Sequence, residues 1–99
     1  MKNNRFQKKF RLSLFAVAVF AGCASAPVQE MSDARQAINA AREAGAAQYS
    51  AGTFAEAKGL LHAAEQQLEV GNYSRARDNA VSAKSKALMA RQEALGKQP

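Results

Sequence analysis

The sequence predicts an all-α protein, a small antiparallel bundle of three helices that follows an N-terminal export signal. From Ser32 onward, the strongest helix formers (Ala, Leu, Glu, Gln, Lys and Arg) dominate, and no proline occurs before Pro99. Apolar residues in this stretch recur at spacings of three and four, which is the period of a helix with one buried face. Ninety-nine residues make one domain at most.

Residues 1–22 have the composition of a signal peptide. A basic segment without acidic residues precedes an apolar run over residues 12–21, which is interrupted only by Ser13. A membrane-spanning helix is the alternative, but it needs about 20 apolar residues, and Gly22, Ser25 and Pro27 end this run too early. The basic residues are Lys2, Arg5, Lys8, Lys9 and Arg11.

The signal also accounts for most of the charge of the chain. The formal net charge is +6, but from Cys23 onward nine Lys and Arg residues stand against eight Asp and Glu residues, a net charge of +1. A nearly neutral product with few aromatic residues lacks the cationic field and the stacking groups that nucleic-acid binding needs. We therefore expect no nucleic-acid partner.

The segment Phe20, Ala21, Gly22 and Cys23 resembles the lipobox of bacterial lipoproteins, in which an aliphatic residue and two small residues precede an invariant cysteine. The resemblance implies that Cys23 becomes the first residue of the mature chain. It also implies an S-diacylglyceryl group and an N-acyl chain, such as palmitate, on that residue. Two or more acyl chains hold a protein stably on a bilayer.

A plain secretory signal, cut after the small-x-small sequence of residues 24–26, is the alternative. Pro27 would then follow the cut, and its ring and missing N–H fit an extended substrate cleft poorly. Lipidation would also remove the single thiol of an exported chain. In lipoproteins of bacteria with two membranes, Asp after the cysteine favours the inner membrane. This chain has Ala24 there, which implies the outer membrane, facing the periplasm.

Residues 23–31 are predicted to be the lipidated cysteine and a short tether that contains Pro27, and residues 32–96 the helical domain. The first helix is expected over residues 33–51, with Ser32 as its N-cap and Gly52 as its C-terminal stop. The second is expected over residues 53–70, because Thr53 and Glu56 match a capping box. Its apolar residues keep helical spacing: Phe54, Ala57, Leu61, Ala64 and Leu68.

The third helix is expected over residues 72–95, between Gly71 and Gly96, with Asn72 as its N-cap. Its apolar face consists almost entirely of alanine. Alanine buries little area, but it lets helices approach more closely than the usual 8 to 10 Å between axes. The alternative is that alanine merely reflects high helix propensity. The residues of this alanine stripe are Ala76, Ala80, Ala83, Ala87, Ala90 and Ala94.

A 19-residue repeat supports this layout, because residues 52–57 (GTFAEA) align with residues 71–76 (GNYSRA). Each unit opens with a glycine, a cap and an aromatic residue. The phrase is similar to the one that opens the second helix of tetratricopeptide repeats, which implies a TPR-like hairpin. The 34-residue period of those repeats is not present.

Residues 34–94 resemble the bacterial family called domain of unknown function 4398. The matching phrases are residues 37–49, then Phe54-x-x-Ala57, then Gly71-Asn72-Tyr73 followed by alanines at helical spacing. The family usually has Ala-Pro shortly after the tyrosine that corresponds to Tyr49, where this chain has Ser50-Ala51-Gly52. The family occurs in short lipoproteins and beside peptidoglycan-binding domains, and the resemblance implies no activity.

No residue pattern predicts an enzyme or a cofactor. His62 is the only histidine and falls beside the apolar face of its helix, where a surface position is the simplest interpretation. A metal site would need three or four ligands, and no acidic pair surrounds His62 at ligand spacing. The aromatic residues Tyr49, Phe54 and Tyr73 stand at predicted helix ends, where they are expected to act as packing anchors.

The remaining functional indication is charge, because the second helix carries a net charge of −2 and the third a net charge of +3. These faces either complement each other or leave the third helix free for anionic lipid or an acidic partner. The candidate interaction face comprises Ala76, Ala80, Ala83, Ala87, Ala90, Arg75, Lys84, Lys86 and Arg91.

We expect a lipid-anchored interaction or scaffolding module whose alanine stripe docks an envelope protein or a second copy, since so small a core is marginal alone. The alternative is a structural tether or spacer associated with peptidoglycan. The sequence favours it less, because Gly52 and Gly71 interrupt a single long helix. The chain also ends in Lys97-Gln98-Pro99 rather than in the C-terminal lysine that such attachment uses.

Overall fold

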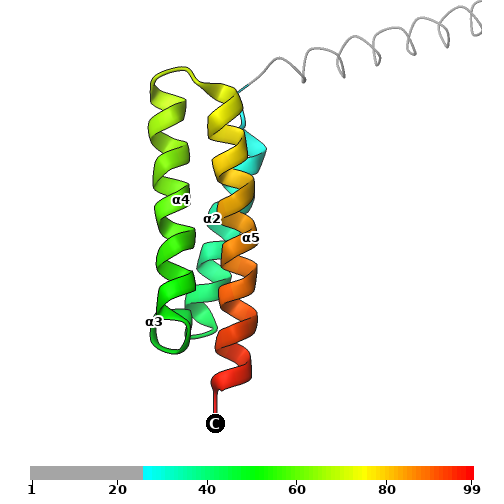
Figure 1. Cartoon of the computed structure of the whole chain (residues 1–99). Coiled ribbons are helices and arrows are strands. Elements are labelled where there is room, and N and C mark those ends of the chain that lie inside the picture. Colours follow the sequence, from blue (N-terminus) through cyan, green and yellow to red (C-terminus); the bar gives the residue numbers. More distant parts are fainter. Residues whose placement is uncertain (1–25) are drawn as a thin grey trace, which may run out of the picture.

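A computed structural model describes residues 26–99, which form four helices and no strand (Figure 1). The helices are α2 (Val28–Glu43), α3 (Ala46–Tyr49), α4 (Ala51–Glu69) and α5 (Tyr73–Lys97). The predicted all-α class is therefore confirmed for this part of the chain. The predictions for the signal peptide, for Phe20, Ala21 and Gly22, and for Cys23 lie outside the described residues.

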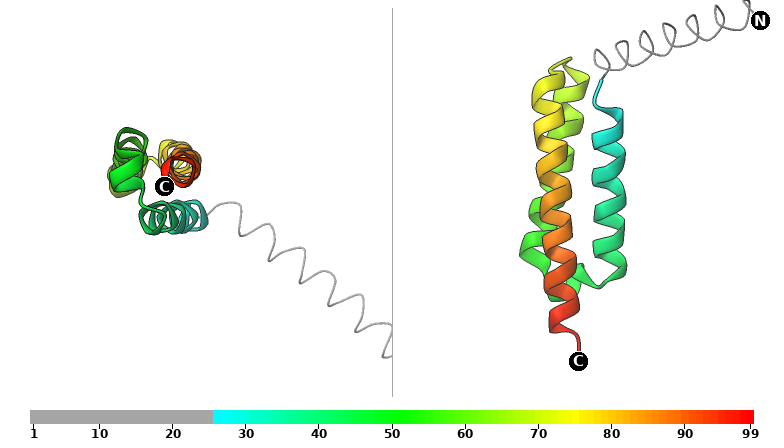
Figure 2. Two further views of the ribbon diagram at one scale, coloured as in Figure 1. Left: turned by 90° about the horizontal axis from the view of Figure 1, so that it is seen from below. Right: turned by 90° about the vertical axis from the view of Figure 1, so that its right-hand side faces the viewer.

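The three long helices lie side by side, and the chain reverses direction from α2 to α4 and again from α4 to α5 (Figures 1 and 2). Helix α5 contacts both α2 and α4 extensively, whereas α2 and α4 contact each other much less. The longest helix therefore holds the other two together.

The core is built around the alanine stripe of α5, whose six residues are all 0% exposed. Near the α3 end they pack with Ile38 of α2 and Phe54 of α4. Near the other end they pack with Met31 of α2 and Ala64 of α4. Small side chains on the shared helix let both neighbours approach it closely. The burial of all six agrees with the prediction that the stripe serves helix packing.

Helix α2 begins earlier than the sequence suggested. The tether was expected to reach residue 31, but the helix starts at Val28, and Met31 is buried in the core. Ser32 lies inside the helix, and Pro27 takes the N-cap position in its place. A proline is tolerated at a helix start because the first N–H groups have no partner within the helix. The linker between Cys23 and the helix is therefore shorter than predicted.

The connection from α2 to α4 also differs from the prediction of one helix over residues 33–51. Helix α2 ends at Glu43, and Gly45 adopts a left-handed conformation with φ of 85°. The single helical turn of α3 follows, and then Ser50 leads into α4. The alanines around Gly45 continue a helical pattern in the sequence, so composition alone did not reveal the reversal.

Two further predictions at this junction are wrong. Gly52 lies inside α4 and does not end a helix. Thr53 is the third residue of α4, so it is no N-cap, and the N-cap residue Ser50 makes no side-chain capping bond.

The turn from α4 to α5 is where the sequence placed it. Gly71 has φ of 80°, which favours glycine, and Asn72 occupies the N-cap position of α5 without a side-chain capping bond. The helix then continues through Gly96 to Lys97, slightly past the predicted end.

Candidate interaction surfaces

One face of α5 is buried in the bundle and the other is exposed to solvent. Part of the predicted interaction surface lies on the buried face. Five alanines were proposed to meet a partner: Ala76, Ala80, Ala83, Ala87 and Ala90. All five are 0% exposed between α2 and α4. No partner can reach them while the bundle is folded, so this prediction is wrong for the alanines.

The outer face of α5 carries large apolar side chains instead. Val81, Leu88 and Leu95 are 53%, 46% and 48% exposed. They are seven residues apart, and seven residues make almost two full turns, so the three side chains line up along the helix with a drift of about 20° per step. We call these three residues the α5 ridge. Met89, the residue after Leu88, is also exposed.

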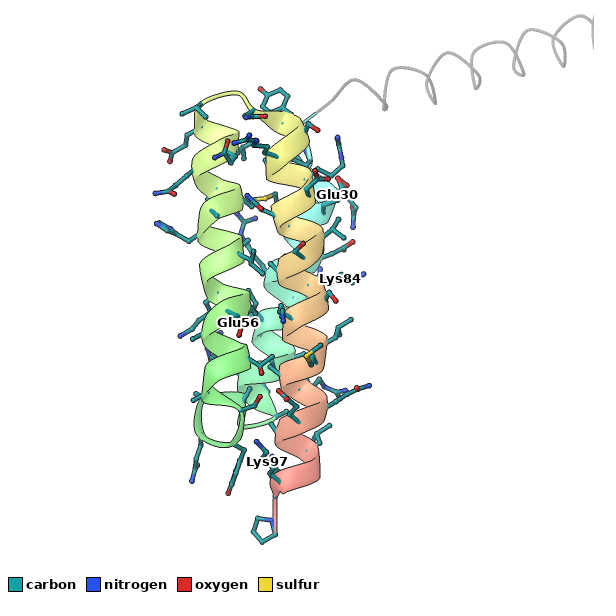
Figure 3. The ribbon with its side chains drawn as sticks, viewed as in Figure 1. Glu30, Glu56, Lys84 and Lys97 are labelled. Carbon is teal, nitrogen blue, oxygen red and sulfur yellow. The ribbon has the colours of Figure 1, made fainter. Side chains whose placement is uncertain are left out.

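Two of the predicted cationic residues fall between the members of the ridge. Lys84 is three residues after Val81 and four before Leu88, and Arg91 has the same relation to Leu88 and Leu95. Residues three and four apart are neighbours on a helix surface. Both cations are exposed and form no ion pair with any residue of 26–99. Figure 3 shows the Lys84 side chain pointing away from α4.

The other two predicted cations are placed differently. Lys86 faces α4, where its Nζ lies 3.1 Å from Oε2 of Glu56. This contact is the complementary pairing of helix faces that the sequence offered as one of its two interpretations. Arg75 is exposed and is the third residue of α5, close to the loop that joins α4 to α5.

Two more ion pairs join the helices. Arg35 of α2 lies 3.4 Å from Glu65 of α4, and Arg77 of α5 lies 3.4 Å from Glu30 of α2. Figure 3 shows Glu30 beside the first turns of α5. Exposed pairs of this kind contribute little to the free energy of folding. Their main effect here is to favour one register between the helices.

The end of the bundle near α3 is closed by polar contacts. The Ser50 hydroxyl donates a hydrogen bond of 2.7 Å to Oε1 of Glu93. That bond, a second one from Thr53 and the nearby lysines Lys97 and Lys86 hold the pKa of Glu93 below its ordinary value, against a smaller opposing effect of burial. The side-chain amide of Gln98 donates to the carbonyl of Ala44. These contacts attach the end of α5 to both ends of the α2–α4 connection.

The three aromatic residues that were predicted to be packing anchors are not equivalent. Phe54 is buried, with Arg42 of α2 and Lys58 of α4 over its ring at 5.6 and 4.8 Å from the centroid. Such cation–π contacts stabilise modestly at exposed positions. Tyr49 is partly buried and packs against the core. Tyr73 is exposed, so it does not act as a packing anchor.

Within residues 26–99, no three His, Cys, Asp or Glu side chains gather where they could hold a metal ion. His62 is exposed on α4, as its position beside the apolar face suggested. None of the helices between residues 26 and 99 combines the length and the apolar character that a membrane span requires.

Comparison with known proteins gives one match. The model of a family described as domain of unknown function (DUF4398) matches residues 29–98, which is most of the chain and all but the first residue of the four helices. No curated protein and no solved structure matched. The matched range covers the resemblance found over residues 34–94 and extends it at both ends. The chain therefore belongs to the DUF4398 family.

Proposed function

We propose that this protein is a lipid-anchored interaction or scaffolding module of the bacterial envelope, held at the periplasmic face of the outer membrane. The lipobox-like residues Phe20 to Cys23 and the Ala24 that follows support the anchor and its location. The interaction role is supported by one observation above all. The helix that holds the bundle together turns a row of large apolar residues, the α5 ridge, toward solvent.

The ridge and its cations define the chemistry of the partner. Scattered exposed apolar residues need no explanation, but the three ridge residues recur at one position of the heptad and alternate with the cations Lys84 and Arg91. Apolar residues at heptad spacing are typical of a helix that packs against a second helix, as in a coiled coil. Because Lys84 and Arg91 stand between the ridge residues, the occupant is best described as an amphipathic helix that carries acidic residues beside its apolar face.

A second copy of the chain fits this surface less well. Antiparallel symmetric pairing of two α5 ridges would bring Lys84 and Arg91 of one chain close to the same residues of the other, because both cations lie on the same flank of the ridge. Like charges at an interface disfavour it. We therefore propose a different envelope protein, and not self-association, as the partner.

We further propose that α4 and α5 form an antiparallel, TPR-like hairpin. The short turn of Val70, Gly71 and Asn72 and the Gly-x-aromatic phrase at residues 71–73 support this. Hairpins of this type present helix faces to peptides and helices of other proteins, which is consistent with a docking role for the α5 ridge.

Photo-crosslinking in living bacteria tests the proposal. A photoreactive phenylalanine analogue replaces Leu88 of the ridge in one strain and Gln66, exposed on α4, in a matched control strain. We expect an adduct with another envelope protein from position 88 and none from position 66. Combining Lys84→Glu and Arg91→Glu with the probe at position 88 should abolish the adduct, because the acidic partner is then repelled.

Each other outcome has a definite meaning. An adduct that survives the charge reversal would contradict an acidic partner, and an adduct of twice the mass of the chain would identify self-association instead. Equal crosslinking from positions 88 and 66 would contradict a specific surface. Co-sedimentation with purified sacculi, without a protein adduct at position 88, would favour the alternative of a peptidoglycan-associated tether.

A further inference from the structure

One end of the bundle combines the start of α2 with the turn between α4 and α5. Figures 1 and 2 place both at the same end, opposite α3. The ion pair between Glu30, in the first turn of α2, and Arg77, in the second turn of α5, agrees with that placement. We call this end, represented by Val28, Val70 and Tyr73, the anchor end.

The anchor end carries apolar side chains that the bundle covers only in part. Val28 is 69% exposed, Val70 is 76% exposed and Tyr73 is 45% exposed. Val70 is the most exposed large apolar residue of the described chain. It precedes Gly71, where a Cβ would meet no atom within 4 Å other than those of its two chain neighbours. Most of the Val70 side chain, and nearly half of Tyr73, is therefore left in contact with solvent.

The short stretch of chain between Cys23 and α2 indicates which surface the anchor end faces. Helix α2 begins at Val28, only five residues after Cys23. Five residues span at most about 18 Å in any conformation. If Cys23 carries acyl chains in a bilayer, the anchor end is held within that distance of them. The α3 end lies farther away by the length of α4, about 28 Å at 1.5 Å for each of its 19 residues.

We propose that the anchor end rests on the bilayer that holds the lipid of Cys23, with Val28, Val70 and Tyr73 in the interfacial layer. This inference rests on the proposed lipid anchor. Tyrosine is enriched at membrane interfaces, because its ring enters the apolar boundary while its hydroxyl stays in the headgroup layer. Three apolar side chains would not hold a free domain on a membrane, but a short tether raises their effective concentration enough for a weak contact to form.

Charge does not contribute much to this contact. Arg75 and Arg77 on α5 are balanced by Glu69 at the end of α4 and by Glu30, the partner of Arg77. The contact is therefore apolar in origin and independent of anionic lipid. It orients the bundle with α2, α4 and α5 standing away from the membrane, which leaves the α5 ridge free to meet a protein partner.

The chain contains no tryptophan, so a single introduced one reports its own surroundings. Full-length chains with Val70→Trp, or with Gln48→Trp at the exposed α3 end as the matched control, are expressed in bacteria and purified from membranes. Each is placed in vesicles of phosphatidylethanolamine and phosphatidylglycerol with brominated acyl chains, which quench tryptophan on contact. We expect severalfold quenching at position 70 and almost none at position 48.

Two additional measurements sharpen the test. Adding Val28→Ser and Tyr73→Ser to the Val70→Trp chain should reduce the quenching at position 70, because two of the three contacts are lost. Omitting phosphatidylglycerol should leave the quenching unchanged, because the contact is apolar.

The mass of each purified chain separates the failure of this inference from failure of the anchor. Lipid on Cys23 together with absent quenching at position 70, or equal quenching at positions 70 and 48, would overturn the orientation and leave the anchor standing. A mass without lipid would overturn the anchor, and the orientation with it. Quenching that disappears without phosphatidylglycerol would show a charge-driven contact and would also overturn the proposal.

Discussion

The two ends of the bundle differ in the contacts that their side chains make. At the α3 end, Ser50 and Thr53 bind the carboxylate of Glu93, and Gln98 binds the carbonyl of Ala44. At the anchor end, Val28 at the start of α2 and Val70 and Tyr73 beside the Gly71 turn are in contact with solvent.

This difference distinguishes residues that hold the fold together from residues that remain available for an external contact. The polar contacts of the α3 end fix a chain reversal that helix propensity alone would not produce. The apolar residues of the anchor end remain largely exposed, which is consistent with the proposed contact with an external surface. Substitutions that are placed along the bundle can therefore distinguish the two ends.

The largest loss of stability is expected from a substitution in the middle of the bundle, where Ala83 is enclosed by α2 and α4. Ala83→Leu adds volume to a packed core, which costs about 1–3 kcal/mol or more. The matched control is Ala55→Leu, the same change at an exposed position of α4, which should leave the free energy of unfolding within about 0.5 kcal/mol. Equal melting temperatures for the two variants in thermal denaturation would contradict the burial of the alanine stripe.

The two left-handed glycines provide the next test, since one stands at each end. Gly45→Ala forces a left-handed alanine and also brings its Cβ to 3.1 Å from Cδ2 of Tyr49, so a loss of about 1–3 kcal/mol is expected. Gly71→Ala has similar backbone strain but no neighbour within 4 Å, and should lose about 1 kcal/mol. Chemical denaturation measures both. A larger loss for Gly71→Ala would mean that the anchor end is the more closely packed one.

A smaller effect is expected from pH, and only at the α3 end. Because the pKa of Glu93 is lowered in the folded state, mainly by Ser50, its ionised form stabilises the fold above the ordinary carboxyl pKa. That stability is lost as pH falls through the lowered value. In denaturation curves at several pH values, Ser50→Ala should flatten this acid dependence. A variant as sensitive to acid as the parent chain would show that another carboxylate is responsible.

The smallest effect is expected at the anchor end. Val70→Ser removes an apolar side chain that the bundle does not cover, so in lipid-free buffer the free energy of unfolding should stay within about 0.5 kcal/mol of the parent value. Equilibrium unfolding in urea measures it. A substantial loss would mean that Val70 packs within the protein, and the argument for a membrane contact would then fail.

Much of the fold could be predicted because the signals that specify it are local. The spacing of alanines in α5, and the sequence Gly71-Asn72-Tyr73 at its start, place the last helix and the turn before it. The reversal at Gly45 could not be predicted in this way. It depends on a glycine among alanines and on contacts from Gln98 and Glu93, which are more than 40 residues distant. A periodic pattern does not record such long-range contacts.

The candidate surface was predicted in part. Periodicity correctly identified one regular face of α5 and assigned it both to close helix packing and to a partner. The structure shows it packed against α2 and α4. The α5 ridge was also present in the sequence, as Val81, Leu88 and Leu95 at intervals of seven. Alanine dominates the helical pattern of this segment, so the spacing of these three residues gives only a weak signal. Lys84 and Arg91 were identified from charge alone, and the structure places both beside the ridge.

Lipid on Cys23 is the feature on which the envelope location and the orientation of the bundle both depend. The most direct measurement is the intact mass of the natural protein, taken from the membranes of the bacterium that makes it, with fragmentation of its N-terminal peptide. We predict a chain that begins at residue 23 and carries a diacylglyceryl group and an N-acyl chain on Cys23. A chain that begins at Met1, or an unmodified cysteine at position 23, would contradict the lipid anchor.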